Sequence, residues 1–310
     1  MSAALDARQP SEPSGAALLT SAEVIEGAKG IAVAGEQVLL AASGRVADLN
    51  AAGANRDAHQ HATHGLAWLA TYVESLRQLA SWAERLDGEG RFGEMEQLIL
   101  QIGVHEYGEQ IAGGIAMSQN EIVRLGDLGV SRTEIRTYED ALHGVVEGWP
   151  LVAAKAALAD LIAAQAGATT FGDSGLDEIH AAMHEEMRRF SEAEVRPYAH
   201  EWHLKNDYIP LETIVKLAEL GVFGVSFPEE FGGMGLGKEA MCIVSEELSR
   251  GYIGVGSLGT RSEIAGELIL ANGTDEQKQK YLPKIAAGEI LQTEVFTEPN
   301  TGSDLASLKT

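Results

Sequence analysis

Residues 296–304 read FTEPNTGSD, and this stretch determines how the end of the chain is interpreted. The run ILQTEVF that leads into it is rich in β-branched and aromatic side chains, which favours a strand. Pro299 and Gly302 then predict a turn with exposed backbone N–H groups and hydroxyl side chains. Such a turn can bind a phosphate or the edge of a heterocycle, but hydroxyl-rich glycine turns without a ligand are also common.

The residues before this stretch are predicted to be helical almost throughout. Apolar residues at helical spacing, such as Leu69 and Leu76, form the stripe of a helix that packs in a bundle. Capping-box patterns at Thr20 and Ser131 predict helix starts. After the break LDGEGRFG, residues 94–125 are interpreted as one further helical segment. The first half of the chain is therefore predicted to be a helical bundle.

The small-residue stretch AGATTFGDSG separates this bundle from a second set of helices. The predicted organisation is a mobile tail at 1–20, a helical extension at 21–166, a linker at 167–175, a helical domain at 176–290 and the start of a β-domain at 291–310.

Composition limits the classes of partner. The 310 residues include 46 acidic and 23 basic side chains, a formal net charge of −23, which disfavours nucleic acid and anionic membrane surfaces. The longest apolar stretch contains Lys155 and Asp160, and no signal peptide opens the chain, so a cytoplasmic protein is expected. The single cysteine, Cys242, fits a reducing compartment and is expected to be a buried small hydrophobe.

Two other motifs are not assigned a function. His59, His61 and His64 lie close together, but no cysteine or carboxylate pair completes a metal site, so polar histidines on a helix face are expected. The stretch GGMGLG at 232–237 follows a helix rather than a strand, which argues against a Rossmann nucleotide loop. No metal is therefore predicted.

Several segments in order, EVRPYAHEW, FPEEFGGMGLG, EELSRG and FTEPNTGSD, together resemble the N-terminal half of the acyl-CoA dehydrogenase family. The resemblance covers Leu176–Thr310. It implies FAD as cofactor, with Phe296 and Thr297 facing the isoalloxazine ring. It also implies that Gly302 and Ser303 approach the pyrophosphate and the CoA thioester. Neutral hydroxyl and amide donors suit flavin carbonyls and phosphate oxygens because they add no full charge beside the ring.

The resemblance also implies a fold and a reaction. The chain is expected to be mainly α, with a helical-bundle extension, the N-terminal helical domain of the family, and then the first strand and FAD loop of an incomplete β-barrel. The reaction is α,β-dehydrogenation of an acyl-CoA, in which a carboxylate removes the α-proton. In the family this base lies further along the chain, beyond Thr310 here. We therefore expect that the 310 residues alone do not turn over substrate.

In combining a long helical extension with these motifs, the chain most resembles family members that act on a short branched acyl-CoA, and the resemblance implies the following expectations. The expected reaction converts methylsuccinyl-CoA to mesaconyl-CoA in the ethylmalonyl-CoA pathway, with electron-transfer flavoprotein as partner and a homodimer as assembly. Arg261 could hold the free carboxylate of such a substrate bidentately, or it could pair with Glu263 or Glu267 on the surface. An isovaleryl-CoA-like dehydrogenase and a non-catalytic helical interaction protein remain alternatives.

Overall fold

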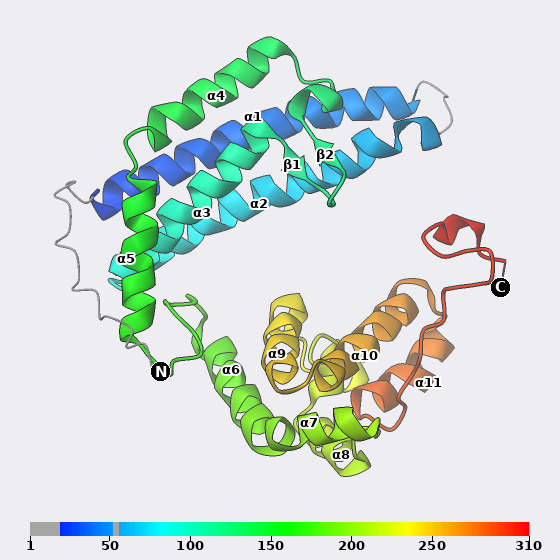
Figure 1. Cartoon of the computed structure of the whole chain (residues 1–310). Coiled ribbons are helices and arrows are strands. Elements are labelled where there is room, and N and C mark those ends of the chain that lie inside the picture. Colours follow the sequence, from blue (N-terminus) through cyan, green and yellow to red (C-terminus); the bar gives the residue numbers. More distant parts are fainter. Residues whose placement is uncertain (1–18, 52–55, 310) are drawn as a thin grey trace, which may run out of the picture. The chain divides into compact units, whose positions relative to one another are not determined.

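The computed structural model describes residues 19–51 and 56–309, which form two compact units (Figure 1). We call residues 1–175 unit 1 and residues 176–310 unit 2. The described residues are mainly helical, which confirms the predicted fold class. Apart from its last two residues, the tail predicted at 1–20 lies outside the described residues.

Unit 1 is a bundle of antiparallel helices with a short hairpin. In chain order it contains α1 Ser21–Ala51, α2 Gln60–Gly88, α3 Glu94–Gly113, β1 Ile115–Ala116, β2 Ile122–Val123, α4 Arg132–Val146 and α5 Leu151–Ala164. The helices α1, α2 and α3 lie alongside one another, and α4 packs against α1 (Figure 1). Capping boxes begin α4 at Ser131 and precede α1 at Thr20, as the sequence predicts.

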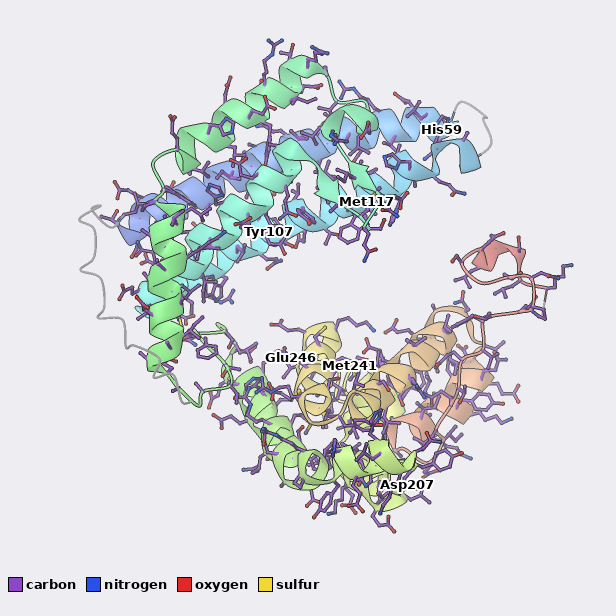
Figure 2. The ribbon with its side chains drawn as sticks, in the orientation of Figure 1. His59, Tyr107, Met117, Asp207, Met241 and Glu246 are labelled. Atoms are coloured by element: carbon purple, nitrogen blue, oxygen red, sulfur yellow. The ribbon has the colours of Figure 1, made fainter. Side chains whose placement is uncertain are left out.

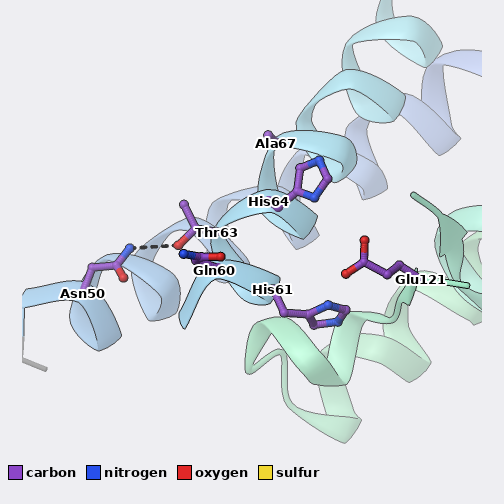
Figure 3. Close-up of a pocket in the computed structure, with 7 residues that line it drawn as sticks. All are labelled: Asn50, Gln60, His61, Thr63, His64, Ala67 and Glu121. Atoms are coloured by element: carbon purple, nitrogen blue, oxygen red, sulfur yellow. Dashed lines mark hydrogen bonds between the residues drawn. The ribbon is translucent and has the colours of Figure 1, made fainter. Parts of the chain in front are cut away.

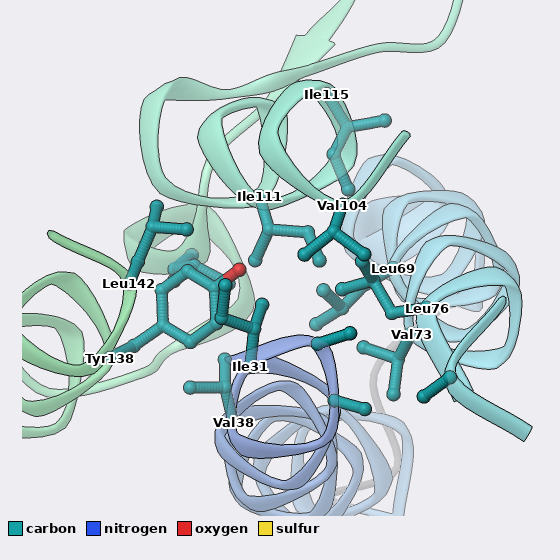
Figure 4. Close-up of a cluster of buried hydrophobic side chains, with 14 of the residues drawn as sticks. Ile31, Val38, Leu69, Val73, Leu76, Val104, Ile111, Ile115, Tyr138 and Leu142 are labelled. Carbon is teal, nitrogen blue, oxygen red and sulfur yellow. The ribbon is translucent and has the colours of Figure 1, made fainter. Parts of the chain in front are cut away.

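The core of unit 1 is formed by the apolar stripes of its helices (Figure 4). It includes Ile31, Val38, Leu69, Val73, Leu76, Val104, Ile111, Tyr138 and Leu142. Tyr138 is the polar member of this set, and its hydroxyl donates to the carbonyl of Gly108 at 3.1 Å. Burial raises the pKa of Tyr138, so this phenol stays protonated and its hydrogen bond is retained.

The prediction of one helical segment over 94–125 was wrong. Helix α3 ends at Gly113, and Gly114 has φ 130°, a conformation that favours glycine. The chain then forms an antiparallel hairpin in which Ile115 pairs with Val123. Both side chains are buried, so the hairpin continues the apolar face of the helix without continuing its backbone. Apolar spacing over so short a distance cannot distinguish the two structures.

The segment predicted as a linker is bound to the end of unit 1 through Asp173. Its carboxylate accepts two hydrogen bonds from Arg91, at 2.8 and 2.6 Å. Its backbone N–H donates to Glu96 at 2.7 Å, and its carbonyl accepts from Trp82 Nε1 at 2.9 Å. Because side chain and backbone are both held, residues up to Gly175 form part of unit 1.

Unit 2 is also helical. In chain order it contains α6 Glu178–Phe190, a π-helical turn Ser191–Val195, α7 Arg196–Lys205, α8 Leu211–Glu219, α9 Gly237–Gly251, α10 Ile253–Asn272 and α11 Asp275–Ala286. Helices α9 and α10 pack closely because glycines line their contact: a Cβ on Gly259 would lie 2.8 Å from Met241. None of the described helices is both long enough and apolar enough to cross a membrane.

The expectation that Cys242 is buried was wrong, because its side chain is exposed on α9. Its neighbours Met241 and Ile243 are buried, and Met241 can be located on α9 in Figure 2. The sequence AMCIVSEEL is apolar on both sides of the cysteine, but a helix turns about 100° per residue. Two buried residues can therefore flank an exposed one.

A buried carboxylate joins α6 to α9. Glu247 on α9 is fully buried, and its two oxygens accept from Arg188 Nε and Nη2 of α6, both at 2.9 Å. His184 Nε2 lies 3.0 Å from the same carboxylate, and Arg250 Nε lies 3.4 Å from it. A fully buried carboxylate is stable only when it is paired and hydrogen-bonded, so these contacts fix the register of the two helices.

Candidate functional site

The run predicted as a strand is extended but has no partner strand in the described part of the chain. No backbone N–H or carbonyl of residues 291–297 takes part in a backbone hydrogen bond there. Exposure nevertheless alternates: Leu291 and Val295 are exposed, whereas Gln292 and Glu294 are half-buried. This period of two is the side-chain pattern of a strand, whereas a ladder of hydrogen bonds requires a neighbour.

Beyond this run, the chain closes into a loop. Glu298 and Thr301 exchange two backbone hydrogen bonds, at 2.9 and 3.0 Å, around a turn at Pro299 and Asn300. The Glu298 carboxylate also accepts from the backbone N–H of Lys309, at 3.2 and 3.3 Å. We call residues 296–309 the TEP loop. Sequence reasoning did not assign a role to Glu298 or Thr301, and the contact of Glu298 with Lys309 spans eleven residues, so it leaves no local pattern.

The four residues assigned by resemblance lie on the outside of the TEP loop. Phe296, Thr297, Gly302 and Ser303 are all exposed. Within residues 19–51 and 56–309, none of their backbone N–H groups and neither hydroxyl makes a hydrogen bond. A Cβ on Gly302 would meet nothing within 4 Å, so the space beside it is open. The assignment of these residues to cofactor binding stays a prediction.

The chemistry of these donors fits a flavin. Four backbone N–H groups and two neutral hydroxyls are free, and all can donate to flavin carbonyls or phosphate oxygens. The acidic side chains of the same loop are already engaged, since Glu298 accepts from Lys309 and Asp304 accepts from Ser307. The free groups of Phe296, Thr297, Gly302 and Ser303 are therefore neutral donors, which suit flavin carbonyls and phosphate oxygens.

Arg261 lies on the exposed side of α10 and does not form the alternative surface ion pair with Glu263 or Glu267. Glu263 and Glu267, its two proposed partners, are both bound by Lys238 of α9 at 2.6 Å. Arg261 itself forms no ion pair or hydrogen bond with any residue that the structure describes. The alternative pairing of Arg261 with Glu263 or Glu267 is therefore not seen among the described residues, and the guanidinium remains available to an external carboxylate.

The histidines near the start of α2 border an open pocket of about 1090 Å³ (Figure 3). His61, His64 and Glu121 line it, and Trp68 Nε1 donates to His64 Nε2 at 3.0 Å. Neither in this pocket nor elsewhere in the described chain are three or more histidine, cysteine or acidic side chains arranged to hold a metal ion. We assign no chemistry to this pocket.

Residues 177–289 match the family model of the acyl-CoA dehydrogenase N-terminal domain. Unit 2 thus belongs to the acyl-CoA dehydrogenase family. The matched residues run from the N-cap of α6 to the turn after α11, so they include all the helices of unit 2. The extended run and then the TEP loop follow this domain.

Relatives in this family differ in how much of the chain they match. A (2S)-methylsuccinyl-CoA dehydrogenase of Cereibacter sphaeroides is 58% identical over 251 residues, 81% of this chain and 45% of that protein. A mitochondrial isovaleryl-CoA dehydrogenase of Solanum tuberosum is 36% identical over 136 residues, 43% of this chain and 33% of that protein. The chain thus spans less than half the length of these acyl-CoA dehydrogenases.

Among solved structures, an acyl-CoA dehydrogenase of Geobacillus kaustophilus is 33% identical, with a TM-score of 0.39. The match covers 43% of this chain and 35% of that one.

Proposed function

We propose that this protein takes part in FAD-dependent α,β-dehydrogenation of a short branched acyl-CoA, converting methylsuccinyl-CoA to mesaconyl-CoA in the ethylmalonyl-CoA pathway. The extent of the match supports this substrate over isovaleryl-CoA. A match of 251 residues is longer than unit 2, so it must include much of unit 1. The isovaleryl-CoA relative matches only 136 residues, about the length of unit 2 alone.

The single observation that carries the proposal is the row of unused donors on the TEP loop. Thr297 and Ser303 offer neutral hydroxyls, and their own N–H groups and those of Phe296 and Gly302 have no partner in the described chain. In the proposed site, these groups bind and orient the cofactor, and a bound flavin supplies the acceptor for the β-hydride. The base that removes the α-proton is proposed to lie outside these residues.

Anaerobic addition of methylsuccinyl-CoA to the protein as its host makes it is expected to bleach the flavin absorption band. The band shows bound flavin, and its loss shows hydride transfer. A flavin band that persists after the addition would be consistent with bound flavin but would contradict methylsuccinyl-CoA as the substrate. A protein without any flavin band would contradict the proposed enzyme and favour a helical interaction protein.

For the distal carboxylate of the substrate, we propose Arg261. Replacing Arg261 by Gln in the protein as its host makes it is expected to raise the KM for methylsuccinyl-CoA by about tenfold or more, because a charge-assisted bidentate contact is lost. The KM for a monocarboxylic acyl-CoA is expected to change little. Steady-state kinetics on both substrates check this, with Lys280→Gln, a change of an exposed cation on α11, as the control. Equal changes in both KM values would contradict the role.

We further propose that the electrons pass to electron-transfer flavoprotein and that the protein is a homodimer, as the family to which unit 2 belongs suggests. We also propose that it is cytoplasmic, in line with the bacterial source of the methylsuccinyl-CoA relative.

A further inference from the structure

Two polar side chains of the TEP loop, Glu298 and Thr301, form hydrogen bonds within the loop and do not belong to the set of free donors on its outer side. Glu298 presents its carboxylate inward to the N–H of Lys309. Thr301 is only 6% exposed, and its hydroxyl donates to the carbonyl of Ser307 at 3.5 Å. The loop therefore has two chemically different sides, one that holds it closed and one that is open to a ligand.

An acidic side chain at this position requires an explanation. A carboxylate beside a bound phosphate or an electron-rich ring would repel it. The Glu298 carboxylate instead accepts an N–H from the far end of the loop, and hydrogen bonds to an ionised acceptor are stronger than neutral ones. Its charge is used within the loop, where it opposes opening of the chain between Glu298 and Lys309.

The inward contacts also lie directly beside the outward donors. Thr297 precedes Glu298, and Ser303 follows Thr301 by two residues. The backbone pair between Glu298 and Thr301 thus fixes the separation and direction of the two segments that carry the free N–H groups. Without this pair, ligand binding would have to order the loop and would be weaker, because ordering costs conformational entropy.

We propose that Glu298 and Thr301 are positioning residues that hold the TEP loop closed, so that the donors of Thr297 and Ser303 are preorganised for FAD. This inference rests on the proposed function. The two residues act through the loop and do not touch the cofactor. The resemblance assigned roles only to their exposed neighbours, and this inference adds Glu298 and Thr301.

The test uses the protein as its host makes it, with Glu298→Ala, Glu298→Gln and Thr301→Val variants. Glu298→Ala is expected to raise the Kd for FAD by about tenfold, because the charge-assisted contact that closes the loop is lost. Glu298→Gln retains an acceptor oxygen and is expected to stay within about threefold of the wild type. Thr301→Val is expected to weaken binding, and Thr301→Ser to restore it. Glu289→Ala, an exposed glutamate before the extended run, is the matched control.

Hydrogen exchange provides a readout that does not depend on the flavin. In the wild type, the peptide containing Lys309 is expected to be protected, and Glu298→Ala is expected to accelerate its exchange at least about tenfold. Protection that is absent in the wild type would overturn the proposed closure. Equal FAD affinity of the wild type and Glu298→Ala would overturn the positioning role while leaving the flavin site intact. A wild-type protein that binds no FAD would overturn both the proposed function and this role.

Discussion

Replacing Glu247 by Ala is expected to lower the free energy of unfolding of unit 2 by about 3 kcal/mol, because it leaves the Arg188 guanidinium without its carboxylate. The Arg188 side chain is about a quarter exposed, so water can solvate part of its charge once the carboxylate is removed. We therefore expect a destabilisation at the lower end of the range of about 3–5 kcal/mol for breaking a buried ion pair. His184 and Arg250 lose the same partner. Urea unfolding, with hydrogen exchange of α6 and α9 to localise the effect, measures this change.

The control for this prediction is Glu186→Ala on α6, the helix that carries Arg188. Glu186 pairs with Arg189 near the surface, where the Arg189 side chain is 72% exposed and that of Glu186 is 40% exposed. Exposed ion pairs contribute about 0–1 kcal/mol, so the control is expected to unfold almost like the wild type. Equal losses for the two variants would show that the buried carboxylate has no special role in joining α6 to α9.

The same cluster predicts how stability depends on pH. Burial alone would raise the pKa of Glu247, but hydrogen bonding and charge from Arg188, with the charges of His184 and Arg250, outweigh it and hold the pKa below the ordinary value of 4.5. The stabilisation is therefore present above about pH 4.5 and is lost as the pH falls through the lower folded-state pKa. The difference in the free energy of unfolding between the wild type and Glu247→Ala, measured across this pH range, gives the contribution of the Glu247 carboxylate, because the variant lacks this group.

Replacing Gly266 by Ala is expected to destabilise unit 2 by about 1–3 kcal/mol, although Ala usually stabilises a helix interior. A Cβ on Gly266 of α10 would lie 2.1 Å from the ring of Phe227, which is almost fully buried. Phe227 cannot yield easily, because its backbone N–H donates to Gly224 and its carbonyl accepts from Gly235. The helix must therefore shift.

The control is Gly30→Ala in α1, where a Cβ would meet nothing within 4 Å. This exposed helical position is expected to show the ordinary benefit of about 0.5–1 kcal/mol, measured by urea unfolding of unit 1. Changes of opposite sign in the free energy of unfolding for Gly30→Ala and Gly266→Ala would show that packing, rather than helix propensity, decides the effect at Gly266. A stabilising Gly266→Ala would contradict the close packing described for Phe227.

Much of the helical architecture could be predicted from local sequence. The stripe through Leu69 and Leu76 recurs at helical spacing, and both side chains are fully buried in the core of unit 1. The capping box at Ser131 likewise begins a helix where the sequence predicts one, because its hydrogen bonds join residues only three apart. The resemblance of unit 2 to the acyl-CoA dehydrogenase family was equally readable, and the family model matches residues 177–289.

The candidate site was only partly readable from the sequence. Resemblance identified Phe296, Thr297, Gly302 and Ser303, whose exposure depends on the turn in which they lie. It did not identify the inward role of Glu298, because its partner is eleven residues away. A contact across a loop has no periodicity, so residue type and spacing do not predict it.

The sequence by itself determined the helix content, the two-part organisation of the bundle and unit 2, and the family motifs, because these depend on contacts between near neighbours. Only the tertiary structure decided that α3 ends at Gly113, that Cys242 is exposed, and that Lys238 rather than Arg261 binds Glu263. Each of these outcomes depends on which distant segment lies beside the residue. That choice is made by packing of the whole unit, where several partners compete for one side chain.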